Sequence, residues 1–183
     1  MKKIYLIMLL SCLALYSFAQ ENGVIVSGGY SFASIENSDT KVPGWRINGV
    51  YEFNPSQGPW AFGIAIGYMG LSTTETVAGS GTVDYKIGTI PVYFAPKFLF
   101  GSDKIKGFIE GAIGTQNSHF TRTGAVEVTS HDWGFYGGGG AGLNIYLNEM
   151  FFLSAEYELA WLSNTAYKDG LMNSAMLGIG VKF

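Results

Sequence analysis

The sequence predicts an all-β fold, an eight-stranded antiparallel up-and-down transmembrane β-barrel. Residues 177–183 alternate strictly between apolar side chains and small or polar ones, and they finish on an aromatic residue. Near the other end lie two lysines and an apolar run of the kind that directs export. The composition combines 26 glycines and 15% aromatic residues with only 14% charged residues. These observations indicate strands with apolar side chains toward lipid and small or polar ones toward a narrow interior.

Residues 1–19 are predicted to be a signal peptide. Lys2 and Lys3 supply its positive start, and 4–18 supply its apolar stretch. Small residues at Ser17 and Ala19 occupy the positions that a signal peptidase reads, so cleavage is expected before Gln20, leaving 20–183 as the barrel domain.

Two alternatives exist for this segment. A retained transmembrane helix would need about 18 or more apolar residues, and the stretch is at the short end of that range. A lipoprotein would be modified at Cys12, whose preceding residues loosely resemble a lipobox. However, apolar sequence continues past Cys12, where a polar tether is usual.

The remaining composition excludes some functions. Removing residues 1–19 takes away the single cysteine and two of the 11 basic residues, but none of the 14 acidic ones. The domain then has no disulfide or thiolate chemistry, and its acidic excess argues against nucleic-acid binding.

Eight strands are expected, separated by turn-forming residues. They cover roughly 23–35, 44–53, 60–73, 82–100, 105–118, 132–147, 151–163 and 172–183. The connections 54–59, 101–104 and 148–150 are short, whereas 36–43, 74–81, 119–131 and 164–171 are longer and polar. Outer-membrane barrels have short periplasmic turns and longer extracellular loops, so both termini are expected on the periplasmic side.

Period-two alternation supports most of these strands. The apolar face is predicted to carry Trp45, Ile47, Tyr51, Phe53, Trp133, Phe135, Leu143, Ile145, Leu147, Phe151, Leu153, Tyr157, Leu159, Trp161, Leu177 and Ile179. The opposite face carries the charged and small residues. A soluble barrel would show the reverse arrangement, and it could not expose so large an apolar surface without aggregating.

Aromatic residues gather near the expected strand ends. Phe53, Trp60, Phe98, Phe100, Phe151 and Phe183 lie by the short turns, and Tyr30, Phe32, Trp45, Tyr68, Tyr85, Trp133 and Trp161 lie by the long loops. Such residues form the two interfacial girdles of an outer-membrane barrel.

The strand at 82–100 is irregular. Tyr85 and Ile87 would face lipid by odd parity, but the apolar residues from Ile90 onward occupy even positions. We interpret the change of parity at Gly88 and Thr89 as a β-bulge.

The segment Ile90-Pro91-Val92-Tyr93-Phe94-Ala95-Pro96-Lys97-Phe98 resembles a central strand of the small outer-membrane β-barrel domain family. These are porin-family barrels of the OmpA-transmembrane-domain-like and OmpX-like eight-stranded type. The resemblance covers the whole mature chain by pattern. It implies an outer-membrane location and assembly by the barrel insertion machinery, with Ile179, Val181 and Phe183 as the C-terminal assembly signal. It implies no activity, because this fold hosts many functions.

A set of charged side chains is predicted to point into the interior. It comprises Arg46, Glu52, Lys97, Glu110, Glu156, Glu158 and Lys182. These charges could form an ion path, or they could form a salt-bridge network that fills the barrel. An eight-stranded interior is just wide enough for side chains, which favours the network.

No catalytic, cofactor or metal residue is predicted. Ser118-His119 and Ser130-His131, with Glu127, contain the residue types of a surface lipid hydrolase, but neighbours on a strand point to opposite faces. The two histidines lack a third metal ligand at suitable spacing.

Gly137, Gly139 and Gly142 match a dinucleotide fingerprint outside its strand–turn–helix context. We interpret these glycines as a thin wall beside Tyr157 and Phe108.

The expected function is therefore that of a non-enzymatic outer-membrane barrel. It would stabilise the envelope or present its four long loops for contact with an extracellular ligand or surface partner. A small passive channel is the alternative, and a surface hydrolase is a remote one. The expected partners are outer-membrane lipid and the barrel assembly machinery, and not nucleic acid.

Overall fold

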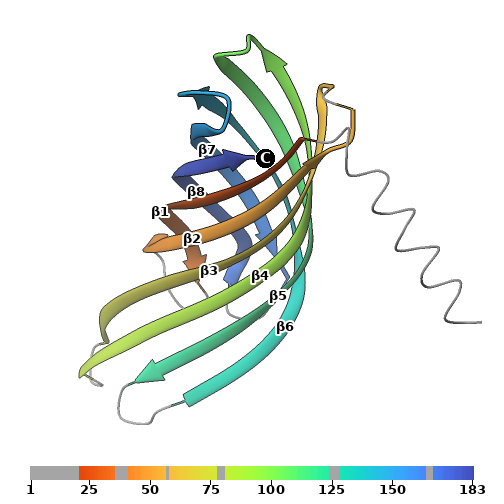
Figure 1. The fold of residues 1–183 in the computed structure, drawn as a ribbon. Coiled ribbons are helices and arrows are strands. Elements are labelled where there is room, and N and C mark those ends of the chain that lie inside the picture. Colours follow the sequence, from red (N-terminus) through yellow and green to blue (C-terminus); the bar gives the residue numbers. More distant parts are fainter. Residues whose placement is uncertain (1–20, 36–40, 57, 78–80, 124–127, 164–166) are drawn as a thin grey trace, which may run out of the picture.

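Eight antiparallel strands close into one barrel in chain order (Figure 1). The computed structural model describes residues 21–35, 41–56, 58–77, 81–123, 128–163 and 167–183. The strands are β1 (Glu21–Ile35), β2 (Lys41–Asn54), β3 (Trp60–Val77), β4 (Gly81–Gly101), β5 (Ile105–Thr123), β6 (Val128–Tyr146), β7 (Phe151–Leu162) and β8 (Tyr167–Lys182). The predicted fold class is confirmed. The predicted signal peptide, 1–19, lies outside the described residues.

No helix within the described ranges is long and apolar enough to cross a membrane.

The barrel closes where the last strand meets the first. β1 and β8 pair from Gly23↔Lys182 to Ala33↔Met172. The Asn22 N–H donates to the Phe183 carbonyl at 3.1 Å, and the Phe183 N–H donates to the Asn22 carbonyl at 2.9 Å. Every strand therefore has a neighbour on each side over part of its length, so the wall satisfies its backbone groups internally, as lipid requires.

The predicted alternation is confirmed in β2, β6, β7 and β8. Outward positions carry exposed apolar residues along the wall, among them Ile47, Leu143, Leu153, Leu159, Leu177 and Ile179. Inward positions carry small, polar or charged residues that are buried, among them Asn48, Asn144, Ser154, Glu158 and Ser174. A continuous apolar outer surface with buried charges inside is the arrangement that hydrocarbon surroundings favour.

The predicted bulge in β4 is wrong. Register with β3 and β5 is continuous through Gly88 and Thr89. Odd residues point inward along the whole strand, so Tyr85 and Ile87 are buried and Lys86 is exposed. Near the long connections the outer surface is polar and the interior holds apolar side chains. The apparent change of parity therefore reflects a change of surroundings along one regular strand.

The two rims of the barrel differ. Short turns join β2 to β3, β4 to β5 and β6 to β7, and the C-terminus lies at the same end (Figure 1). Gly101, the last residue of β4 before the turn, has a φ of 117°, and a Cβ there would lie 2.6 Å from the Ile105 carbonyl oxygen. Glycine is the residue that accepts this left-handed turn conformation without strain.

At the opposite rim, β3, β4, β5 and β6 extend beyond the other strands (Figure 1). They are 18 to 21 residues long, whereas β7 has 12. Pairing continues to Val77↔Gly81 between β3 and β4, and to Arg122↔Val128 between β5 and β6. We call these ends, residues 72–77, 81–86, 119–123 and 128–134, the projecting sheet.

Candidate functional site

Charged side chains occupy the interior at successive levels. Arg46 and Glu158 lie at one level, and Lys97 lies with Glu52 and Glu110 at a level closer to the short turns. Lys182 lies at the short-turn rim, in the last residues of β8. Each is brought inside because its position has the inward parity of its strand.

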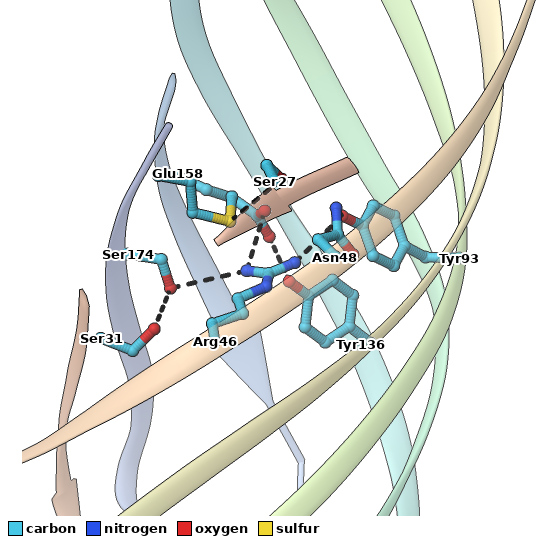
Figure 2. Close-up of polar contacts among 9 residues, drawn as sticks. Ser27, Ser31, Arg46, Asn48, Tyr93, Tyr136, Glu158 and Ser174 are labelled. Atoms are coloured by element: carbon cyan, nitrogen blue, oxygen red, sulfur yellow. Dashed lines mark hydrogen bonds and ion pairs between the residues drawn. The ribbon is translucent and has the colours of Figure 1, made fainter. Parts of the chain in front are cut away.

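Arg46 is the centre of the first level (Figure 2). Its Nη1 lies 2.9 Å from Oε2 of Glu158, and both side chains are fully buried. Nη1 also donates to Oγ of Ser174 at 3.5 Å, and Nη2 donates to the hydroxyl of Tyr93 at 3.0 Å. Because these groups come from β2, β7, β8 and β4, a single guanidinium connects four strands across the barrel.

Two tyrosines fill the space beside this ion pair (Figure 2). The rings of Tyr93 and Tyr136 lie 4.9 Å apart, and the guanidinium of Arg46 lies 5.9 Å from each ring centroid. The Tyr136 hydroxyl donates to Glu158 Oε1, and the amide of Asn48 donates to the Tyr93 hydroxyl at 2.9 Å. The carboxylate and guanidinium thus keep hydrogen-bond partners that offset part of the cost of burying their charges.

Lys97 holds the second level together. Its ammonium lies 2.7 Å from Oε2 of Glu52 and 3.4 Å from Oε2 of Glu110. The same ammonium lies 4.4 Å from the centroid of the Phe108 ring. A Cβ at Gly142 would lie 2.5 Å from that ring, so the glycine makes room for Phe108, as the sequence predicted.

Glu156 differs from the other interior carboxylates. Oxygens of Glu110, Glu156 and Glu158 lie within 4.8 Å of one another. Lys97 and Arg46 pair with the other two glutamates, and Oε1 of Glu156 is buried without a hydrogen-bond partner. No lysine or arginine of the described residues forms an ion pair with Glu156, so the expectation that it is paired is not met.

Lys182 belongs to the rim and not to the central network. Its ammonium lies 2.5 Å from Oε2 of Glu21 and 5.2 Å from the centroid of the Tyr146 ring. Glu21 was missed from the sequence because the first strand was placed at residue 23. Extending the first strand by two residues, with the same alternation of faces, would have placed Glu21 on the inward face.

The interior is also closed on both sides of the charges. Toward the long connections, Thr89 shares hydrogen bonds of 2.7 Å with Ser118 and with Tyr167. Toward the short turns, a cavity bordered by Glu52, Leu99 and Tyr146 has a volume of about 10 Å³. That is space for about one water molecule. Among the described residues, packed side chains therefore cross the barrel axis at each of these levels.

The serines and histidines do not assemble a hydrolytic site. Ser118 is buried and hydrogen-bonded to Gln116 at 2.6 Å, whereas His119 is exposed on the outer face. His119 Nδ1 lies 3.0 Å from Nε2 of His131 on the neighbouring strand. Glu127 lies outside the described residues. A serine on the inner face and a histidine on the outer face cannot exchange a proton.

The C-terminal residues of the predicted assembly signal lie on the outer wall. Ile179 and Phe183 are exposed, and Val181 between them is partly exposed on the same face. The predicted aromatic girdles point outward as well, with one exception: Tyr85 is buried inside, 6.3 Å from the ring of Phe120.

Comparison with known proteins agrees with this architecture. The family model of the outer membrane protein beta-barrel domain matches residues 5–183. The chain is similar in structure to Ail, the attachment invasion locus protein of Yersinia pestis, solved with the heparin analogue sucrose octasulfate. That match has a TM-score of 0.59 and 18% identity, and it covers 91% of this chain and 100% of Ail.

Neisserial surface protein A, NspA, is also similar, with a TM-score of 0.62 and 15% identity over 88% of this chain and 97% of that one. No curated protein sequence matches the chain. The match to the family model spans nearly the whole length, and the barrel has the lipid-facing wall and closed strand order that this family requires. The chain belongs to the outer membrane protein beta-barrel domain family, and its location is the outer membrane of a Gram-negative-type envelope.

Proposed function

We propose that this protein is a closed, non-enzymatic outer-membrane barrel that holds its projecting sheet at the cell surface for contact with a partner outside the cell. The buried Arg46–Glu158 pair is the observation that carries the first half of this proposal. A channel needs a water-filled path along the barrel axis. Here that axis is crossed by a guanidinium, a carboxylate and two tyrosine rings.

The projecting sheet supports the second half. In β6, pairing with β7 begins at Tyr136↔Leu162, but β6 itself begins at Val128. Within the described residues, no strand pairs with residues 128–134 on that side. An unpaired strand edge is a template onto which an extended segment of another chain can add.

The direction of the backbone groups along this edge follows from two contacts. The Ser163 N–H donates to the Phe135 carbonyl at 3.0 Å, so Phe135 bonds toward the β7 side. The Gly134 carbonyl accepts a bond of 3.0 Å from Thr115, so Gly134 bonds toward β5. Because bonding direction alternates in an antiparallel strand, Thr129, His131 and Trp133 direct their N–H and C=O groups to the open edge.

The orientation of the barrel is part of the proposal. The short-turn rim, with both ends of the barrel domain, would face the periplasm, because short turns occupy that side in this class of barrel. Residues 1–19 would direct export and be removed. Ile179, Val181 and Phe183 would be read by the barrel assembly machinery before insertion.

The ligand of the Ail structure is not transferred to this chain. A heparin analogue is a polyanion, and its recognition needs an excess of basic residues. The projecting sheet carries Lys86 and Arg122 but also Glu75, Asp84 and Asp132, so it has no basic excess. A protein segment that adds to the β6 edge fits this surface better than a sulfated polysaccharide.

Planar-bilayer recording tests the closed interior. The purified barrel should show no stepwise current, because the packed ion pairs and tyrosines leave no continuous water path. A matched outer-membrane porin recorded in the same chamber is the positive control. Reproducible steps whose ion selectivity changes in Glu158→Gln would replace this proposal with the channel alternative.

Cell attachment tests the surface contact. Cells that display the barrel would be applied to a panel of immobilised extracellular proteins and to immobilised heparin. Attachment to a protein surface, absent from cells without the barrel, is expected, and binding to heparin is not. If displaying cells attach to nothing in the panel, the contact role is rejected and the envelope-structural role remains.

A further inference from the structure

The outer wall has a hollow at the boundary between its apolar band and the projecting sheet. Its volume is about 570 Å³, and it spans β2 to β5. It is bordered by Trp45, Tyr68, Ile90 and His119. Lys86 lies at the edge of the hollow that is nearest to the long connections. It faces away from the barrel axis, so it is separate from the interior network.

The floor of the hollow consists of two glycines in directly paired positions. Trp45 pairs with Gly70, Gly70 with Gly88, and Gly88 with His119. A Cβ at Gly70 would lie 3.0 Å from the indole nitrogen of Trp45, and one at Gly88 would lie 2.7 Å from the Tyr68 hydroxyl. The glycines thus leave a recess into which the polar ends of both aromatic rings point.

The outer face changes in polarity near this row. On the side of the short turns it carries Ile66 on β3 and Val92 and Ile90 on β4, whereas β5 carries Ile113 followed by the polar Thr115 and Asn117. On the side of the long connections it carries Ser72, Lys86 and Thr121 instead. Aromatic residues with polar tips belong at the level of lipid headgroups, so the hollow lies where hydrocarbon gives way to headgroups.

Lys86 is an exposed ammonium at that level. Among the described residues no carboxylate lies within 4.0 Å of it; Asp84, the next acid on the same face, instead accepts a hydrogen bond of 2.6 Å from Thr74. Ser72 and Thr121 are its direct cross-strand neighbours.

A string of polar side chains continues from Lys86 across the wall. Nε2 of His119 lies 3.2 Å from Oγ1 of Thr121, and Nδ1 of the same ring lies 3.0 Å from Nε2 of His131. A hydroxyl group and imidazole nitrogens therefore lie along the strands that follow Lys86 in the sheet, beginning at its paired residue Thr121.

We propose that this hollow binds a phosphate-bearing lipid of the surrounding leaflet, with its phosphate at Lys86 and an acyl chain along Ile90 and Trp45. A compact ammonium flanked by hydroxyl donors suits a phosphate group. An apolar wall directly below suits the chain attached to that phosphate. With the orientation proposed above, this is the outer leaflet, but binding itself does not depend on the orientation or on a surface partner.

Reconstitution with two lipids that differ only in the phosphate tests the proposal. The mature barrel would be placed in phosphatidylcholine nanodiscs that contain either phosphatidic acid or diacylglycerol with the same chains. After extraction, native mass spectrometry counts the lipids retained on each barrel. Retention of phosphatidic acid over diacylglycerol is expected, and equal retention of both would overturn the phosphate assignment.

Matched variants assign the site to Lys86. Lys86→Gln should bind phosphatidic acid about tenfold more weakly, as expected for losing one hydrogen bond to a charged group. Lys86→Arg should restore retention. Lys104→Gln, which removes an exposed lysine at the opposite rim, should retain the lipid like the native protein. Unchanged retention in Lys86→Gln, or equal loss in Lys104→Gln, would reject the site.

A final experiment distinguishes binding of a lipid from binding of free phosphate. Inorganic phosphate added to the nanodiscs should leave the retained phosphatidic acid in place, because the acyl contacts contribute to binding. If inorganic phosphate displaces the lipid completely, the hollow is a phosphate site and not a lipid site. Heat-modified migration on gels confirms that each variant is folded before the comparison.

Discussion

Arg46 is buried, charged and bonded to side chains from three other strands, and its position decides what the barrel interior can be. An ion pair taken out of water stabilises a fold only when its geometry is good and its remaining donors and acceptors are bonded. The Arg46–Glu158 pair meets most of this requirement through Tyr93, Tyr136 and Ser174. Removing one partner of this ion pair should therefore lower the stability of the barrel substantially.

Two neighbouring inward glutamates, Glu158 and Glu156, should respond differently to the same substitution. Glu158→Gln leaves Arg46 buried without its anion and should lower the free energy of unfolding by about 3–5 kcal/mol. Glu156→Gln replaces a carboxyl group that forms no ion pair among the described residues and lies near two other carboxyl groups, so it should be neutral or stabilising. Urea titration of barrels folded into lipid vesicles measures both. An equal loss in the two variants would contradict the assigned pairing.

At the scale of elements, the four long strands β3 to β6 give the molecule its asymmetry. β6 extends past the end of β7, whose last pair with it is Tyr136↔Leu162. The edge of β6 that faces β7 is therefore unpaired over residues 128–134 in the described structure. Ladder bonds to β5 support the inner edge of the same segment. The two edges of one strand therefore have different roles.

Proline substitutions at two adjacent positions of β6 test the open edge and the edge paired with β5 separately. Thr129→Pro removes an N–H that points to the open edge, so hydrogen exchange at the end of β5 should stay as slow as in the native protein. Ser130→Pro removes an N–H that points to β5 and should speed exchange around Phe120, its paired residue. In the attachment assay, Thr129→Pro should weaken contact. Equal exchange in both variants would show that the edge direction is misassigned.

At the scale of the whole molecule, the apolar outer wall should make stability depend on depth in the bilayer. Leu177, which is 72% exposed, lies well inside the wall opposite Gly28, whereas Val181 pairs with Phe151 at the start of β7. Arginine near the middle of the bilayer costs about 2–4 kcal/mol, and this falls to about 0–1 kcal/mol at the interfaces.

Leu177→Arg should accordingly destabilise the barrel far more than Val181→Arg. Unfolding by urea in vesicles of one defined lipid measures the two costs side by side. The native protein and a variant at the exposed turn residue Glu149 serve as references. Equal penalties at both positions would mean that the wall does not span hydrocarbon in the way described.

The sequence alone determined the number of strands, the faces of most of them and the inward placement of the charged residues. Alternation has a period of two, and a lipid-facing wall makes that period visible as strict apolar repetition. The sequence of β4 suggested a bulge for the same reason: toward the long connections, beyond the membrane level, the inside of the barrel is apolar and the outside polar. The pattern therefore reverses although the strand is regular.

Only the tertiary structure decided which charges meet. Arg46 and Glu158 lie more than a hundred positions apart, and their pairing depends on the register of every strand between them around the closed barrel. The hollow beside Lys86 likewise depends on aligning two glycines and two aromatic residues from three strands. Local sequence sets the face on which a side chain lies. Its neighbours across the barrel follow from closure, which is a property of all eight strands at once.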